Sequence, residues 1–373
     1  MDRRDFILAA AATPLNAEEA PAPPPYRVVS AFQPSSRPGM PGPYRGQLAR
    51  VHATNPLDVA TGKSDGALVR RMLAEGICAL TGEKEARDGW ARFVNASDVV
   101  GIKVNCSGAP NIMSDPEVVA GIAESLIAAG VAPSRIYVYE KFQNQMRTVG
   151  YEKFVPAGVH VITAEEGGRG SILGYDPKTY VEANFFGEED TRSQMVRLVS
   201  EKLTKIISVP NTKEHRAAGV TGALKNASYG HFSNVDRSHR WEKTNTRTFI
   251  GTLASVEPVR SRTVLNVMDG LRGVWHGGPF STNARFRFFP GQIWFGTDPV
   301  AMDRILIDLI EEKRKAEGAP SIWDRSKERI KNEREVDPAV NRFIREPGHV
   351  EFAAGLGLGV YDKAKIRVRE VRL

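Results

Sequence analysis

Cysteine is almost missing from this sequence, since Cys78 and Cys106 are the two cysteines among 373 residues. Two thiols are too few for the disulfide framework of a small secreted protein, and too few for the cysteine ligands of an iron–sulfur cluster. We therefore expect no Cys-ligated iron–sulfur cluster in this protein.

Long hydrophobic runs are lacking as well. The apolar run near the N-terminus ends at Thr13 and Pro14, well short of the roughly 20 residues that a membrane-spanning helix needs. We expect no integral membrane segment in the mature chain. A basic stripe interleaved with aromatic residues is also missing, so the sequence does not predict binding to nucleic acid.

The composition that is present is that of a globular protein with a real core. Hydrophobic residues make up 41% and charged residues 25% of the chain, which excludes a disordered, collagen-like or multi-spanning protein. Lys and Arg exceed Asp and Glu by 51 to 44, and the acidic residues are scattered among the basic ones. The net charge of +7 permits a small anionic ligand and leaves the oligomeric state unknown.

The first 25 residues have the features of an export signal. Arg3 and Arg4 precede a short apolar segment, and small residues follow near residues 17–22. The arginine pair before Phe6 resembles a twin-arginine signal, which predicts export of the folded protein to the periplasm. A Sec-type signal or an uncleaved amphipathic segment are the alternatives. A Pro-rich linker ends at Pro25, and we expect an irregular arm over residues 26–65.

From residue 66 to residue 373 the sequence alternates helical and strand patterns. Strands separated by helices predict an α/β fold with a mainly parallel sheet in a three-layer α/β/α sandwich, forming one domain. An alternating pattern near the C-terminus predicts an exposed edge strand. Residues 165–190 and 275–290 break the rhythm and are expected to be insertions or hairpins. The expected helices cover 65–80, 116–129 and 299–314, and the expected strands 98–105, 135–140, 159–163, 205–210, 262–269, 292–296 and 365–371.

Polar side chains follow several of the predicted strands. In open parallel sheets, ligands bind in the crevice beyond the carboxyl ends of the strands, so residues there are candidates for a binding site. We predict a cleft for a small anionic ligand, bound by Lys103, Asn105, Lys213, Arg216, Lys225 and Asn226. His215, Asp269 and Asp298 are the candidate catalytic residues, with His215 as general acid or base.

Residues 210–226, PNTKEHRAAGVTGALKN, contain the densest set of candidates. Gly219 and Gly222 permit tight turns that turn backbone amides toward a ligand, and the nearby lysines and Arg216 add positive charge. The spacing is neither that of a P-loop nor that of a dinucleotide-binding motif. The alternative is a plain glycine-rich connection with solvated basic residues.

Histidines gather in the same part of the chain. Imidazole is the commonest transition-metal ligand, so His215, His231 and His239 are candidate ligands of a divalent metal. Their spacing is not that of a compact zinc motif, and a hydrogen-bonded structural role is the alternative for each of them.

Several motifs resemble the domain-of-unknown-function family 362 (DUF362). They are DVVGIKVN at 98–105, PEVV at 116–119, VPNTKEH at 209–215, AGVTGALKN at 218–226, YG at 229–230, DG at 269–270, GGP at 277–279 and DPVAMD at 298–303. The resemblance runs from about residue 96 to residue 312, with a weaker AAGLG tail at 353–357, and the leader is similar to that of exported members. Many members add a ferredoxin-like domain with cysteine runs, which this sequence lacks.

Two functions follow as hypotheses. The first is an exported enzyme that acts on a small anionic or carbonyl-bearing substrate in the Lys-, His- and Asp-lined cleft. The second is a non-catalytic protein that binds a metal or cofactor and is exported in the folded state. A cleft that holds Lys103, Lys213, His215, Lys225 and Asp298 together is the geometric test of the first hypothesis.

Overall fold

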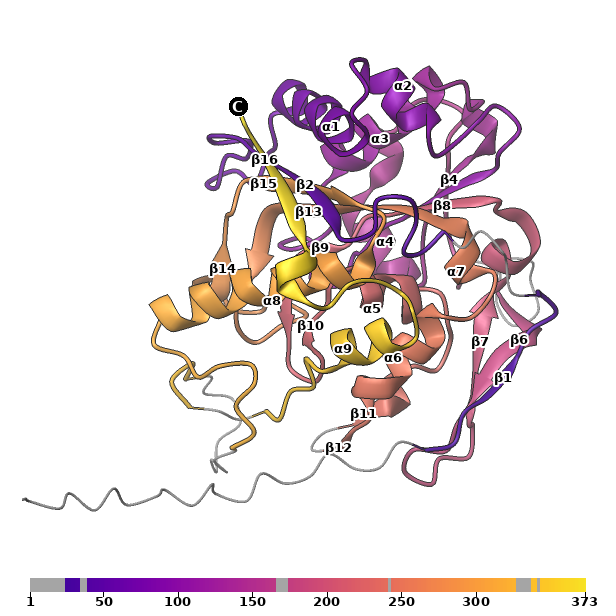
Figure 1. Cartoon of the computed structure of the whole chain (residues 1–373), viewed down its shortest axis with the longest axis vertical. Helices are drawn as coiled ribbons and strands as arrows, with labels where there is room; N and C mark the ends of the chain where they lie inside the picture. Colours follow the sequence, from indigo (N-terminus) through magenta and orange to yellow (C-terminus); the bar gives the residue numbers. More distant parts are fainter. Residues whose placement is uncertain (1–23, 34–38, 166–173, 241–242, 327–336, 341–342) are drawn as a thin grey trace, which may run out of the picture.

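The computed structural model describes residues 24–33, 39–165, 174–240, 243–326, 337–340 and 343–373. A mixed, mostly parallel sheet runs through the centre (Figure 1), in the strand order β16-β2-β15-β13-β8-β3-β4-β5. These strands span Arg367–Arg372, Gln47–His52, Gln292–Gly296, Thr263–Val274, Lys205–Ser208, Val100–Lys103, Ile136–Glu140 and His160–Thr163. Three short strands join its rim, namely β9 (Asn211–His215), β10 (Gly219–Val220) and β14 (Arg287–Phe288).

The strand directions decide which ends share an edge. β13, β8, β3, β4 and β5 are parallel to one another, so their carboxyl ends meet at one edge of the sheet. β15 is antiparallel to β13 and to β2, and β2 is parallel to β16. The carboxyl end of β15 therefore lies at the opposite edge from the ends of β3, β4 and β8.

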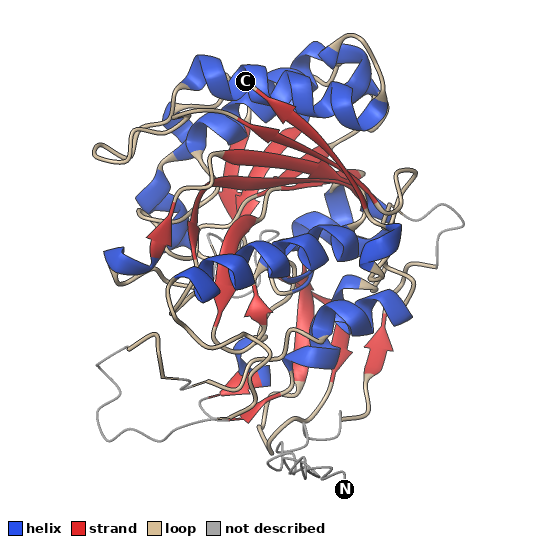
Figure 2. Ribbon diagram, turned by 60° about the vertical axis from the view of Figure 1, so that its left-hand side comes forward, coloured by secondary structure: helices blue, strands red, loops and turns tan. Residues whose placement is uncertain are grey.

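Helices cover both faces of this sheet (Figure 2), as the predicted three-layer sandwich requires. The helices are α1 (Gly66–Thr81), α2 (Ala86–Ala91), α3 (Pro116–Ala128), α4 (Gln143–Val149), α5 (Gly222–Ser228), α6 (Thr246–Ala254), α7 (Val259–Arg262), α8 (Pro299–Ala316) and α9 (His349–Gly355). Single helical turns, 3₁₀ except for the π-turn η3, are η1 (Pro133–Arg135), η2 (Tyr151–Lys153), η3 (Leu198–Lys202), η4 (Asp236–Ser238), η5 (Ala284–Phe286) and η6 (Lys363–Lys365). No helix among the described residues is long and apolar enough to cross a membrane.

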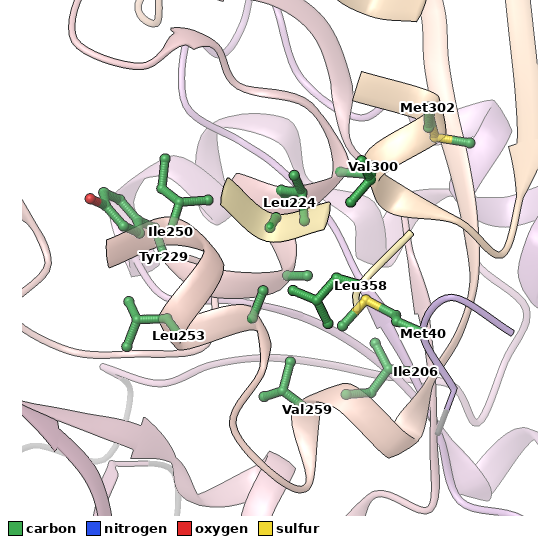
Figure 3. Packing of buried hydrophobic residues seen from close by; sticks show 14 of the residues in the cluster. Met40, Ile206, Leu224, Tyr229, Ile250, Leu253, Val259, Val300, Met302 and Leu358 are labelled. Atoms are coloured by element: carbon green, nitrogen blue, oxygen red, sulfur yellow. The ribbon is translucent and has the colours of Figure 1, made fainter. Parts of the chain in front are cut away.

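Two apolar cores lie on the two faces. Neighbouring strand residues point to opposite sides, so Ile206 packs with α5, α6 and α8 while Ile207 packs with α1 and α3. Figure 3 shows the first core, to which Leu224, Leu253, Val300 and Leu358 belong. The buried strands are apolar on both sides, as expected for a parallel sheet covered by two helical layers.

The predicted helix starts are confirmed by their caps. Asp65 accepts a hydrogen bond from Leu68 N at the start of α1, and Asp115 accepts one from Glu117 N at the start of α3, which has Pro116 in its first turn. The short polar side chain satisfies a backbone N–H that has no partner within the helix. The C-terminal edge strand is also confirmed, because β16 pairs with β2.

The arm expected over residues 26–65 is more regular than its composition predicts. Residues 47–52 form β2 between β15 and β16, and its Leu48, Ala49 and Val51 are buried. Within residues 165–190, the strand β6 (Tyr175–Glu182) pairs with β7 (Arg192–Val196), as a hairpin would, and with β1 (Arg27–Val29). β11 (His239–Arg240) and β12 (Lys243–Thr244) form a separate pair. The export signal lies outside the described residues.

Candidate functional site

The strands β3 and β4 end in an ion pair inside the protein. Lys103 Nζ donates to Glu140 Oε2 at 2.6 Å and to the Val104 carbonyl at 2.5 Å. Their side chains are 1% and 8% exposed, so this charge pair lies almost entirely out of water. A buried pair of this kind costs desolvation energy, and it persists because both partners are hydrogen-bonded.

Lys213 lies beside this pair, and no carboxylate of the described residues accepts a hydrogen bond from it. Its Nζ donates to Asn105 Oδ1 at 2.8 Å and to the Ser107 carbonyl at 2.6 Å. Burial lowers the pKa of Lys213 to about 7, although the negative charge of Glu140 raises it in part. The amine is therefore poised to take up a proton when an anion arrives beside it.

Lys225 contacts His215. Nδ1 of His215 accepts hydrogen bonds from Ala217 N at 3.1 Å and from Ala218 N at 3.2 Å, so the ring proton is assigned to Nε2. Nε2 lies 2.5 Å from Lys225 Nζ. The imidazole therefore donates to the lone pair of an uncharged amine. Burial and the charge of Lys213 lower the pKa of Lys225 well below its usual value.

The helix α5 carries Lys225 and Asn226 and is anchored from two sides. Asn226 Nδ2 donates to the Lys103 carbonyl at 3.2 Å and to Ser208 Oγ at 3.0 Å. On the other side, the carboxylate of Asp303 on α8 accepts from Ala223 N at 2.6 Å and from Leu224 N at 2.9 Å. Burial raises the pKa of Asp303 to about 7.

Gly222 permits the close approach of Asp303 to α5. Its φ is +54°, and a Cβ there would lie 2.1 Å from Asp303 Oδ1. Only glycine suits both the left-handed backbone and the contact.

A fourth lysine, Lys141, follows β4. Burial lowers its pKa to about 8, and its Nζ lies 5.1 Å from the centre of the Phe142 ring. We call Lys103, Lys141, Lys213 and Lys225 the lysine cluster; each is at most 9% exposed. Within the part of the chain that the structure describes, Glu140 is the only carboxylate hydrogen-bonded to the cluster. Positive charge therefore exceeds negative charge at the predicted edge of the sheet.

Asn211 belongs beside the cluster and was not among the predicted site residues. It is fully buried, and both its Oδ1 and Nδ2 lack a hydrogen-bond partner. In β9 it alternates with Thr212, so it shares a strand face with Lys213 and His215. A buried amide without partners is costly and is a candidate ligand contact. The sequence could have indicated Asn211 as a site residue, because it directly follows a predicted strand.

The structure brings most of the predicted ligand-binding residues together. Lys103 contacts Asn226, and Lys213 contacts Asn105. The charge of Lys103 acts on Lys213, and that of Lys213 acts on Lys225. Arg216 is the exception, because it is exposed and its guanidinium lies over the Phe343 ring at 5.2 Å. Burial and neighbouring positive charges, that of Arg216 included, lower the pKa of His215.

Asp298 does not lie at this edge, and the expectation that it shares one cleft with Lys103 is wrong. It follows β15, which runs against β13, and so it sits at the other end of the sheet. Its carboxylate caps α8 through Ala301 N and accepts from Gly46 N and Val360 N. These three backbone contacts give Asp298 a structural role.

Asp269 lies inside β13 and not at its end, because the strand continues to Val274. Its carboxylate accepts from Asp115 N at 2.6 Å and Leu271 N at 2.9 Å. Burial, followed by the charge of Asp115, raises the pKa of Asp269 to about 7. Neither of these hydrogen bonds joins it to the lysine cluster, so its catalytic role stays a prediction.

The three candidate metal ligands are not arranged as one set. His231 Nδ1 donates to the Ala227 carbonyl and its Nε2 accepts from Tyr139 Oη, both at 2.7 Å, so both nitrogens are engaged inside the protein. The His215 ring lies 5.5 Å from the His239 ring, and both His215 nitrogens are also engaged. Over the described residues, no group of three or more His, Cys, Asp or Glu side chains could hold a metal ion.

One hollow of the described surface is lined by residues between Asn55 and Asp65. None of its lining residues belongs to the lysine cluster.

Comparison with known proteins places the same segment in a family. The model of a family described as a domain of unknown function, DUF362, matches residues 100–308, which is more than half of the chain. This range contains all four lysines of the cluster. No protein with a curated description matches the chain.

Proposed function

The chain belongs to the DUF362 family, and from its buried lysine cluster we propose that it is an enzyme acting on a small anionic substrate that carries a carbonyl group. The observation that carries the proposal is the excess of buried positive charge. Lys103 is neutralised by Glu140, whereas no carboxylate of the described residues accepts a hydrogen bond from the side-chain amine of Lys141 or of Lys213. Burying unpaired charge is unfavourable, and an anionic ligand relieves that cost.

The residues divide into two roles. Lys213 and Lys141 provide the positive charge that attracts a carboxylate or phosphate, and the Asn105 and Asn211 amides lie beside them to accept or donate hydrogen bonds. Each hydrogen bond between an amine and a carboxylate or phosphate contributes about 1.5–3 kcal/mol. His215 exchanges protons only through Nε2, because Nδ1 is held by two backbone N–H groups.

The residues of the site differ in how deeply they are buried. Lys225 and Asn105 are each 9% exposed, more than Lys103 and Lys213 at 1% and 0%. A ligand would therefore enter near Lys225 and Asn105 and place its anionic group toward Lys213.

Isothermal titration calorimetry with inorganic phosphate and with glyoxylate tests the proposal. We expect the Lys213→Met variant to bind either anion at least about tenfold more weakly than the natural protein, which corresponds to about 1.4 kcal/mol. Lys313→Met is the matched control, because Lys313 pairs with Glu317 at the surface of α8. Equal affinity of the natural protein and Lys213→Met, or absence of binding in both, would overturn the proposal.

We also propose that the protein is exported to the periplasm through the twin-arginine route. The support is the sequence of the first residues, in which Arg3 and Arg4 precede a short apolar segment. Mass spectrometry of the protein from cell fractions would identify its mature N-terminus. Export that persists unchanged in an Arg3→Lys, Arg4→Lys double variant would contradict this route.

A further inference from the structure

We propose that Lys225 is the nucleophile of this site, and that the substrate is a small oxo acid whose carbonyl carbon condenses with the Lys225 amine to a Schiff base. This inference rests on the proposed function and names its substrate class and its reacting atom. It changes the role of Lys225 from a residue that contacts the ligand to the group that forms a covalent bond with it.

The hydrogen bonds around His215 are the main evidence. Two backbone N–H groups, of Ala217 and Ala218, donate to Nδ1, so the neutral ring has its proton on Nε2. An ammonium group would place a second proton in the 2.5 Å space between Nε2 and Lys225 Nζ. The geometry is satisfied only when Nζ is an uncharged amine whose lone pair accepts the hydrogen bond from Nε2. A nucleophilic lysine needs this lone pair, which attacks the carbonyl carbon once the hydrogen bond to Nε2 opens.

The surroundings keep the amine uncharged. Lys225 is enclosed by protein, and the positive charges of Lys213 and Lys141 lower its pKa in the same direction as burial does. Lysines next to other cationic groups in a water-poor site are activated in this way.

Lys213 would bind the carboxylate of the oxo acid, while Lys225 reacts with its carbonyl carbon. A carboxylate next to the reacting carbonyl would lie against Lys213, which donates at present to Asn105 and Ser107. The same charge that lowers the pKa of Lys225 would therefore hold the acid group of the substrate. A neutral aldehyde lacks this contact, so the site favours oxo acids over simple aldehydes.

The reaction conserves atoms and electrons and needs no oxidant or reductant. The Nζ lone pair attacks the carbonyl carbon, the C=O π electrons move to oxygen, and one proton passes from nitrogen to oxygen to give a carbinolamine. The C–O bond then breaks, water leaves with a second proton from nitrogen, and the nitrogen lone pair forms the C=N bond. His215 Nε2–H lies at Nζ to donate the proton to the leaving hydroxyl and to recover one from nitrogen.

Borohydride trapping tests the inference. The full-length protein is incubated with limiting glyoxylate and sodium borohydride, which reduces a Schiff base to a stable secondary amine, and the adduct is located by peptide mass mapping. We expect one adduct, at Lys225, formed at least about tenfold faster than at the surface residue Lys313. Acetaldehyde, which lacks the carboxylate, should label Lys225 at least about tenfold more slowly.

The outcomes separate this inference from the proposed function. Glyoxylate binding by calorimetry without a trapped adduct at Lys225 would overturn the Schiff base and leave anion binding standing. Adducts spread evenly over surface lysines, or equal labelling by acetaldehyde, would also overturn the inference. Mapping on the natural protein needs no variant, and Lys225→Met, with its folding checked by thermal unfolding, should lose the adduct while Lys313→Met keeps it.

Discussion

Arg345 Nε donates a hydrogen bond to Glu214 Oε1 at 2.6 Å, and both side chains are almost completely buried. Glu214 lies in β9 between Lys213 and His215, and its Oε2 accepts from Gly278 N at 2.8 Å. This one carboxylate therefore joins the strand that carries two site residues to two distant segments of the chain. It also faces away from the lysine cluster, since alternate residues of a strand point to opposite sides.

Replacing Arg345 should be among the most destabilising single changes. Arg345→Met leaves the buried Glu214 carboxylate without its guanidinium, which typically costs about 3–5 kcal/mol of the free energy of unfolding. Arg50→Met is the control, because the Arg50–Glu370 pair is partly exposed and should be worth less than about 1 kcal/mol. Urea denaturation measures both values, and equal losses in the two variants would contradict the role of Glu214.

Asp303 should stabilise the protein through α5. In Asp303→Ala the N–H groups of Ala223 and Leu224 lose their acceptor, and we expect a loss of about 1–3 kcal/mol for each buried donor left unpaired. Asp308→Ala changes the same helix at a partly exposed position and should cost less than about 1 kcal/mol. Calorimetry should show that the affinity for the anion falls in Asp303→Ala and stays unchanged in Asp308→Ala. Unchanged affinity in both variants would contradict a role of Asp303 in positioning the site.

Lys213 should make stability depend on alkaline pH. Its pKa is about 7 in the folded protein and 10.5 in an ordinary lysine, so the folded state bears an energetic penalty for its charge below pH 7. Between pH 7 and pH 10.5 the unfolded chain binds the proton that the folded protein has released, and stability therefore rises with pH. Each unit of pKa difference corresponds to about 1.4 kcal/mol.

The comparison with Lys213→Met isolates this effect. The difference in free energy of unfolding between the variant and the natural protein should favour the variant most below pH 7 and shrink toward pH 10.5. A difference that is constant over this range would show that Lys213 titrates normally.

Asn211 should contribute to binding and not to stability. Both its amide atoms are buried without a partner, so Asn211→Leu, of similar size, should leave the free energy of unfolding unchanged or raise it by about 1 kcal/mol. Glyoxylate affinity should fall about tenfold, because the bound anion loses an amide contact. Asn95→Leu, in the turn before β3, is the control. It removes the acceptor of the Ser97 N–H and lies outside the site, so it should lower stability and leave glyoxylate affinity unchanged. A large loss of stability in Asn211→Leu would contradict this assignment.

Much of the site could be predicted from positions at strand ends. Lys103, Lys213 and Lys225 were expected together, and parallel strands do bring their carboxyl ends to one edge. Asp298 could not be placed correctly, because its position depends on the direction of β15. The connection from β13 to β15 over residues 275–291 contains no α-helix. A connection without a helix permits β15 to run antiparallel to β13, and this feature could have indicated the direction of β15.

Other residues depend on contacts that sequence patterns do not encode. Glu214 meets Arg345, and Asp303 meets α5, across large separations in the chain. Glu140 stood at a recognised strand end, but its pairing with Lys103 follows from the neighbour order of β3 and β4. β2 was hidden within a segment rich in Pro, Gly and Ser, where tertiary pairing with β15 and β16 overrides composition.

The pairing of β2 with β16 has a consequence for the order in which the chain can fold. β2 leaves the ribosome early, whereas its outer neighbour, residues 367–372, is synthesised near the end. Until then β2 presents an open strand edge, which other chains can pair with. The sheet therefore closes only after synthesis is nearly complete, and deletion of residues 367–372 should leave a folding intermediate prone to aggregation rather than a slightly shorter native protein.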